Sequence, residues 1–148
     1  MRDRLLEKKD EIRRILMRLE GRRKRLLKPG FLELGLTLGM GQPRILNQLS
    51  RKDGISQREL ADLCDMDVTT LSRTLDRLEE AGWLERKKHP ECRRSFAICL
   101  TEEGRKKAVG VRNGFERLDQ QICQGFSEEE LETLSGFLKR MEENLEDQ

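Results

Sequence analysis

The chain has 148 residues, of which 39% are charged, yet its formal net charge is only +2 at pH 7. This length predicts one domain that buries a core without a disulfide or a metal. One histidine and four scattered cysteines, with no glycine-rich phosphate loop or nucleophile elbow, argue against an enzyme, a zinc site and a bound cofactor. The sequence contains neither a secretory signal nor a membrane-length apolar segment, so we expect a cytoplasmic protein with free thiols and no membrane partner.

The charge is distributed unevenly along the chain. Residues 1–28 carry 12 Lys and Arg against 5 Asp and Glu, whereas residues 126–148 carry 2 basic against 8 acidic residues. The two ends are therefore electrostatically complementary, which favours packing between terminal helices over two solvated tails.

A long basic helix is predicted over residues 2–27, because a leucine or isoleucine recurs every seven residues from Leu5 to Leu26. Such a narrow apolar stripe needs a partner. The "KPG" at 28–30 predicts the end of this helix. A second helix is predicted over about 41–49.

Three further helices have clear N-terminal signals. Ser56 and Glu59 form an S-x-x-E capping box, Asp67 is a good N-cap, and Ser127 with Glu130 repeats the capping box. We therefore expect helices over 57–64, 68–81 and 128–146.

A β-hairpin is predicted between these helices. "WLERKK" (83–88) precedes a proline turn, and Phe96, Ile98 and Leu100 then alternate as one face of a second strand. Thr101 caps a further helix that reaches about residue 122. This helix and the last one carry apolar residues at spacings of three and four, which is typical of helices packed lengthwise on other helices.

The close spacing of helices 57–64 and 68–81 indicates a helix-turn-helix, and the hairpin directly after it makes the unit winged. The predicted fold is mainly α with a small β-hairpin wing, a winged helix-turn-helix core flanked by long dimerisation helices. The predicted segments are a dimerisation helix and linker (1–35), the DNA-binding core (36–101) and C-terminal dimerisation helices (102–148). The predicted dimerisation residues are Leu5, Ile12, Leu19, Phe115, Leu118, Ile122, Leu131, Leu134, Leu138, Met141 and Leu145.

A helical wheel of residues 68–81 separates a core face from an outward face. Leu71, Leu75 and Leu78 share the core side, and hydroxyls and arginines project away from it. Such a face fits a DNA major groove, although it is also compatible with an ordinary solvated surface. The candidate DNA contacts of this helix are Val68, Thr69, Thr70, Ser72, Arg73 and Arg77.

The hairpin adds a cluster of cations, among which we count Arg86. The candidate wing contacts are Lys87, Lys88, Arg93 and Arg94, with the two tip arginines entering the minor groove. Lysines along an exposed strand can instead discourage aggregation. Cys92, beside these cations, is a candidate redox sensor with a stabilised thiolate, or simply a tolerated exposed cysteine.

At this level of detail the sequence resembles the MarR (multiple-antibiotic-resistance regulator) family of winged helix-turn-helix transcription factors. The resemblance is carried by "SQRELADLCDMDVTTLSRTLDRLEEAGWLERK" (56–87), "RRSFAICLTEEG" (93–104), "LTLGMGQPRILNQL" (36–49) and "FSEEELETL" (126–134). It implies a homodimer that binds a palindromic operator in double-stranded DNA, as a repressor released by a small-molecule effector. The effector pocket implied by the family lies near residues 12–19, 31–46 and 108–115.

The sequence departs from the family at the tip of the wing. The family's Asp-x-Arg is represented by Cys92 and Arg94, so the arginine is kept and the aspartate is lost. The peroxide-sensing branch uses a cysteine in the first helix, and this chain has none before Cys64. Two alternatives remain open, a thiol redox-sensing regulator of the same fold and a winged-helix protein–protein adaptor.

Overall fold

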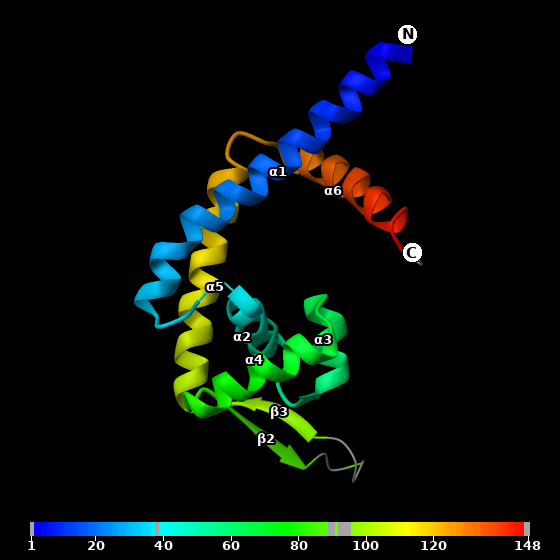
Figure 1. Cartoon of the computed structure of the whole chain (residues 1–148). Coiled ribbons are helices and arrows are strands. Elements are labelled where there is room, and N and C mark those ends of the chain that lie inside the picture. Colours follow the sequence, from blue (N-terminus) through cyan, green and yellow to red (C-terminus); the bar gives the residue numbers. More distant parts are fainter. Residues whose placement is uncertain (1, 38, 89–90, 92–95, 147–148) are drawn as a thin grey trace.

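The structure has the predicted order of elements, with one short strand added. The computed structural model describes residues 2–37, 39–88, 91 and 96–146. The elements are α1 (Arg2–Glu33), the 3₁₀ turn η1 (Gly39–Gly41), α2 (Gln42–Arg51), β1 (Ile55–Ser56), α3 (Gln57–Cys64), α4 (Val68–Glu80), β2 (Leu84–Lys88), β3 (Phe96–Leu100), α5 (Glu102–Ile122) and α6 (Glu128–Glu143). In Figure 1, α2, α3, α4 and the sheet form one lobe, and α1 and α5 run side by side away from it. The predicted fold class, a mainly helical winged helix-turn-helix, is confirmed.

The predicted break of the first helix at 28–30 is wrong. α1 runs through Pro29 and Gly30 to Glu33. Proline removes one helical hydrogen bond, but Phe31 is only 2% exposed and its ring meets that of Phe115 edge-on at 5.4 Å. This packing keeps the segment helical. The helix ends instead before Gly35, whose φ of +85° is the left-handed conformation that glycine adopts at helix C-termini.

The helix starts follow the predicted capping signals, with one difference. The side chains of Ser56, Asp67, Thr101 and Ser127 each accept a hydrogen bond from a backbone N–H three residues on. At Ser127 the box is complete, because the Glu130 carboxylate also accepts from the Ser127 N–H at 2.9 Å. At Ser56 only half of the box forms. The carboxylate of Glu59 bonds Lys52 at 2.5 Å instead.

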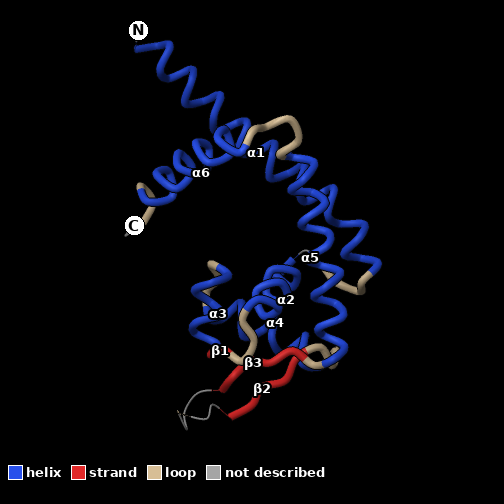
Figure 2. The backbone as a smooth tube through the Cα atoms, turned by 180° about the vertical axis from the view of Figure 1, so that it is seen from behind, coloured by secondary structure: helices blue, strands red, loops and turns tan. Residues whose placement is uncertain are grey.

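The hairpin is part of a three-stranded antiparallel sheet in the order β1–β3–β2, seen from behind in Figure 2. β1 was not predicted, since it contains only two residues. Of the three residues predicted to share one face of β3, Ile98 and Leu100 are buried, but Phe96 is 52% exposed. Phe96 pairs with Lys88 at the end of the hairpin that projects from the lobe, where no helix covers it.

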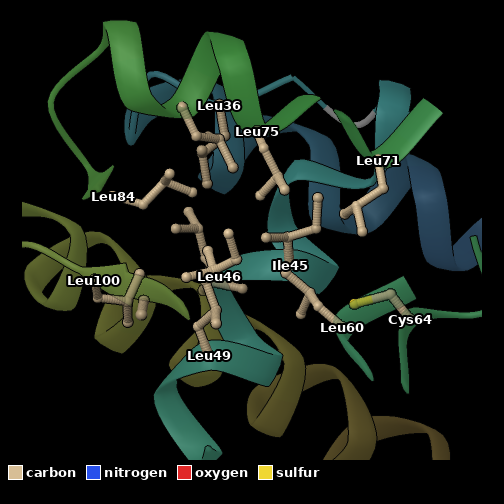
Figure 3. Close-up of a cluster of buried hydrophobic side chains, with 14 of the residues drawn as sticks. Leu36, Ile45, Leu46, Leu49, Leu60, Cys64, Leu71, Leu75, Leu84 and Leu100 are labelled. Carbon is tan, nitrogen blue, oxygen red and sulfur yellow. The ribbon is translucent and has the colours of Figure 1, made fainter. Parts of the chain in front are cut away.

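The core of the lobe joins α4 to α2, α3 and the sheet. Leu71, Leu75 and Leu78, the predicted core face of α4, are each at most 1% exposed. Figure 3 shows side chains from all these elements meeting in one cluster: Leu36, Ile45, Leu46, Leu49, Leu60, Cys64, Leu71, Leu75, Leu84 and Leu100. Burial of one face of α4 fixes which of its residues point outward.

None of the helices in the described ranges is long and apolar enough to cross a lipid bilayer.

Candidate nucleic-acid interface

The outward face of α4 carries the side chains that the sequence predicted for DNA contact. Thr69, Arg73 and Arg77 are exposed and Val68 is 56% exposed. The two remaining candidates, Thr70 and Ser72, are half-buried. The helix therefore presents two guanidinium groups and a hydroxyl on the side opposite the leucines. These groups can bond guanine edges and phosphates in a major groove.

The first turn of α4 is fixed by Asp67. Its carboxylate accepts a hydrogen bond from the Thr70 N–H at 2.9 Å. Hydrogen bonds from Thr70, from its side chain and its backbone, hold the pKa of the Asp67 carboxyl below its usual value. The carboxylate is therefore charged at neutral pH, at the positive end of the helix dipole, where it stabilises the start of the helix.

The described part of the wing exposes Lys87 and Lys88 at the end of β2. The ammonium of Lys87 lies 3.3 Å from the carboxylate of Glu85, a solvent-exposed pair. Three predicted tip residues, Arg93, Arg94 and Cys92, lie outside the described residues.

Arg86 does not belong with the outward cations, so counting it among them was wrong. Its side chain is only 19% exposed, and Nη1 lies 2.9 Å from Asp76 Oδ1 and 3.6 Å from Glu79 Oε2. Nη2 also donates to the Ser72 carbonyl oxygen at 3.4 Å. Arg86 therefore ties β2 to α4. The sequence could have predicted this inward position, because side chains alternate along a strand and Arg86 therefore shares a face of β2 with the buried Leu84.

A second connection, which the sequence reasoning missed, joins the wing to the long helices. The ammonium of Lys107 in α5 donates to the Leu34 carbonyl at 2.6 Å and lies 5.1 Å from the centre of the Trp83 ring. Gly104 packs so closely on the Trp83 backbone that an added Cβ would lie 1.7 Å from its carbonyl oxygen. The end of α1, the start of β2 and α5 are therefore held together next to α4.

The described cysteines do not form a reactive centre. Burial raises the pKa of the Cys64 thiol to about 11 and also raises the pKa of Cys99. Cys64, Cys99 and Cys123 are free thiols. Among the described residues, no cluster of three His, Cys, Asp or Glu side chains is placed to hold a metal ion.

A groove of about 460 Å³ lies between α1 and α5. Leu27, Phe31, Leu34 and Leu118 supply apolar lining, and Arg117 supplies a polar group. It overlaps the ranges expected for an effector pocket at 31–46 and 108–115, but not at 12–19.

The predicted dimerisation residues differ in their exposure within the single chain. Phe115 is half-buried against Phe31 and Leu118 is 5% exposed, so both already have partners within one chain. Leu131 is half-buried. The others are at least 36% exposed in the single chain: Leu5, Ile12, Leu19, Ile122, Leu134, Leu138, Met141 and Leu145.

Comparisons with known proteins place this geometry in context. A MarR family model matches residues 34–95. The HTH-type transcriptional regulator YybA of Bacillus subtilis is 31% identical over 111 residues, which cover 75% of this chain and 74% of YybA. The crystal structure of the transcriptional regulator SlyA is 31% identical, with a TM-score of 0.79 over 92% of this chain and 94% of that one. A MarR family regulator from Listeria monocytogenes, crystallised with 26mer DNA, is 26% identical, with a TM-score of 0.80 over 89% and 87%.

Proposed function

The chain belongs to the MarR family of DNA-binding transcriptional regulators, and we propose that it is a homodimeric repressor that binds a palindromic operator in double-stranded DNA. Members of this family regulate transcription and are not enzymes.

The outward face of α4 is the observation that carries this proposal. Arg73 and Arg77 project from a helix whose opposite face is fully buried, so they are presented on a rigid support. The wing projects beside α4 in Figure 1. In a two-fold dimer, the two α4 helices enter successive major grooves about 34 Å apart. Thr69, Thr70 and Ser72 then contact bases or phosphates near the start of the helix, and Val68 contacts a thymine methyl group.

The wing supplies the flanking contacts. Lys87 and Lys88 neutralise phosphates, and Arg93 and Arg94 at the tip enter the adjacent minor groove. The two lysines are exposed on the described part of the strand, which supports the first half of this assignment. The assignment of Arg93 and Arg94 to the minor groove rests on the sequence alone.

Release from DNA follows binding of a small-molecule effector, for which the groove between α1 and α5 offers an apolar lining. Oxidation of Cys92 is the alternative trigger. Oxidant would then weaken DNA binding by the native chain and leave the Cys92→Ser variant unaffected.

The test is a titration of the purified protein with a labelled duplex from its own upstream region and with a scrambled duplex, at two salt concentrations. A specific regulator prefers its operator by about 10³-fold or more, and its affinity falls steeply as salt rises. Arg73→Ala should weaken operator binding, whereas Arg140→Ala, which removes the same charge from α6, should not. Weak, salt-insensitive binding to both duplexes would favour the protein–protein adaptor instead.

A further inference from the structure

The described part of the wing exposes one aromatic side chain. Phe96 begins β3 and is 52% exposed, whereas Ile98, two residues further along the same strand face, is fully buried. A single exposed apolar residue is ordinary on a protein surface. The place of Phe96 relative to α4 is what gives it a role.

One face of the hairpin is turned toward α4. Side chains alternate along a strand, so Leu84, Arg86 and Lys88 share one face of β2. Arg86 on this face reaches α4, where its Nη1 lies 2.9 Å from Asp76 Oδ1. Lys88 therefore points to the same side of the hairpin as Arg86, roughly 7 Å further along the strand. It is exposed there.

The register of the sheet places Phe96 on this same side. Arg86 is opposite Ile98, and Lys88 is opposite Phe96. Residues directly opposite each other in an antiparallel pair of strands project from the same face of the sheet. Phe96 and Lys88, the wing pair, therefore lie together on the α4 side of the hairpin, beyond the ion pairs of Arg86. Figure 2 shows this end of β2 and β3 projecting from the lobe.

The proposed complex with DNA brings one strand of the duplex to the wing pair. In that complex α4 lies in a major groove, and the tip of the wing lies in the adjacent minor groove. Neighbouring grooves are separated by one sugar–phosphate backbone. That backbone must pass between α4 and the tip of the wing, which is the side that the wing pair faces.

We propose that the wing pair holds this backbone, with the Phe96 ring packed on a deoxyribose and the Lys88 ammonium bound to an adjoining phosphate. The inference rests on the proposed function and adds Phe96 to it as a DNA contact. Sugar and phosphate are the same at every base pair. The contact therefore fixes the position of the wing along the groove and does not itself read the sequence.

The two side chains act on different parts of the backbone. The ring covers C–H groups of the sugar, and this apolar contact is not screened by salt. The ammonium neutralises a phosphate and releases a counterion, so its contribution falls as salt rises. Salt dependence therefore distinguishes the two halves of the wing pair.

Phe96→Ala tests the apolar half. Affinity for the duplex from the chain's own upstream region should fall about three- to tenfold, since one ring is no longer covered. The slope of log affinity against log salt should stay unchanged, whereas Lys88→Ala should lower it by about 0.9. Phe96→Leu keeps an apolar side chain and should retain most of the affinity. The thermal midpoint of Phe96→Ala without DNA should equal that of the native chain, because the ring is exposed there.

Phe126→Ala is the matched control. Phe126 is also 52% exposed, but it lies in the connection between α5 and α6. Figure 1 shows this connection away from the lobe. The control removes the same exposed ring and should leave both the affinity and the salt slope unchanged.

Hydroxyl-radical footprinting measures the proposed contact directly. The radical cleaves DNA by removing hydrogen atoms from deoxyribose, so a covered sugar is protected. With protein at saturation, Phe96→Ala should lose protection at the few sugars between the major-groove and minor-groove contacts and keep the rest of the native footprint. Phe126→Ala should keep all of it.

Three results would overturn the wing pair, and they separate it from the proposed function. If Phe96→Ala has the affinity and the footprint of the native chain, Phe96 does not touch DNA, and the proposed function stands. If its affinity falls together with about 0.9 of the salt slope, the lost contact is to a phosphate and not to a sugar. If the native chain binds both the upstream and the scrambled duplex weakly and without salt dependence, the proposed function fails and the wing pair fails with it.

Discussion

Replacing Arg86 tests whether this residue positions α4, the proposed DNA-reading helix, or contacts DNA itself. Arg86→Met removes the bonds from β2 to Asp76 and to the Ser72 carbonyl, and it leaves Asp76 and Glu79 on α4 without their cation. A charge-assisted hydrogen bond contributes about 1.5–3 kcal/mol. Asp76 is 67% exposed, so solvent screens part of this. We therefore expect a loss of about 1–2 kcal/mol in the free energy of unfolding.

The effect on DNA binding should have a distinctive salt dependence. Each phosphate that a cation neutralises contributes about 0.9 to the slope of log affinity against log salt. Arg86→Met should lower affinity, because α4 loses its polar contacts with the wing, but it should leave this slope unchanged. Lys88→Ala should lower the slope by about one unit, since Lys88 is exposed on the wing.

Fluorescence anisotropy across a salt series measures the slope, and denaturant unfolding without DNA measures the stability. Arg86→Lys keeps one ion pair to Asp76 and should recover part of both losses. A direct contact between Arg86 and DNA would be indicated instead if Arg86→Met had the same free energy of unfolding as the native protein and its slope of log affinity against log salt fell by about 0.9, the contribution of one phosphate.

Three further substitutions test the supports of the site, and a fourth, on α6, serves as a comparison. Asp53→Ala should cost about 1–2 kcal/mol of unfolding free energy in denaturant titrations, because the Asp53 carboxylate accepts from the Leu100 N–H of β3 at 2.8 Å and that donor would be left unpaired. Gly104→Ala should cost about 1–3 kcal/mol by the same measurement, since its Cβ would collide with a backbone carbonyl, whereas Gly136→Ala, with open space around it, should stabilise by about 0.5–1 kcal/mol. Because the pKa of Asp67 is lowered, the stabilising charge of its carboxylate is fully present above pH 3.8, the usual pKa of an aspartate, and is lost as the pH falls through the lowered pKa. Asp67→Asn removes this charge at every pH. The loss of helical circular dichroism at acid pH should therefore be smaller in the variant than in the native protein.

Local signals predicted the helix starts because their physics is local. A cap such as Asp67 or Ser127 is satisfied by a backbone N–H three residues away, so no distant part of the chain has to be known. The core face of α4 was predicted for a similar reason, since the spacing of its leucines is a property of the helix alone. These two signals together placed the candidate DNA contacts on the outward face.

The errors arose where distant contacts decide the outcome. Pro29 predicts a helix end, yet Phe31 packs against α5 and keeps the turn helical. Glu59 matches a capping box, yet Lys52 offers its carboxylate a stronger partner. In each case a side chain from another element overrides the local preference, and a single sequence does not reveal which element that is.

The candidate site was predicted in its chemistry but not in its supports. Arg86 was read as one cation among several, whereas the fold turns it toward two carboxylates of α4. The contact of Lys107 with Leu34 joins residues that are 73 positions apart in sequence. The residues that we propose contact DNA were recognisable by their type and by their place on the outward face of α4. Residues that hold them in place are recognisable only when the packing is known.

These supports connect the long helices α1 and α5 to α4, the helix that we propose reads DNA. Lys107 holds the end of α1 and the Trp83 ring at the start of β2, and Arg86 then holds β2 to α4. α4 is therefore connected to α1 and α5 by contacts at Trp83, just before β2, and at Arg86 in the middle of β2, in addition to its apolar core. In the proposed homodimer, if the two copies are joined through α1 and α5, the distance between the two α4 helices follows the angle between the long helices of the two copies. Because successive major grooves are about 34 Å apart, a change of a few ångströms in that distance would misplace one of the two helices. Under the proposed function, an effector that alters the packing of α1 on α5 would thus weaken DNA binding without touching α4.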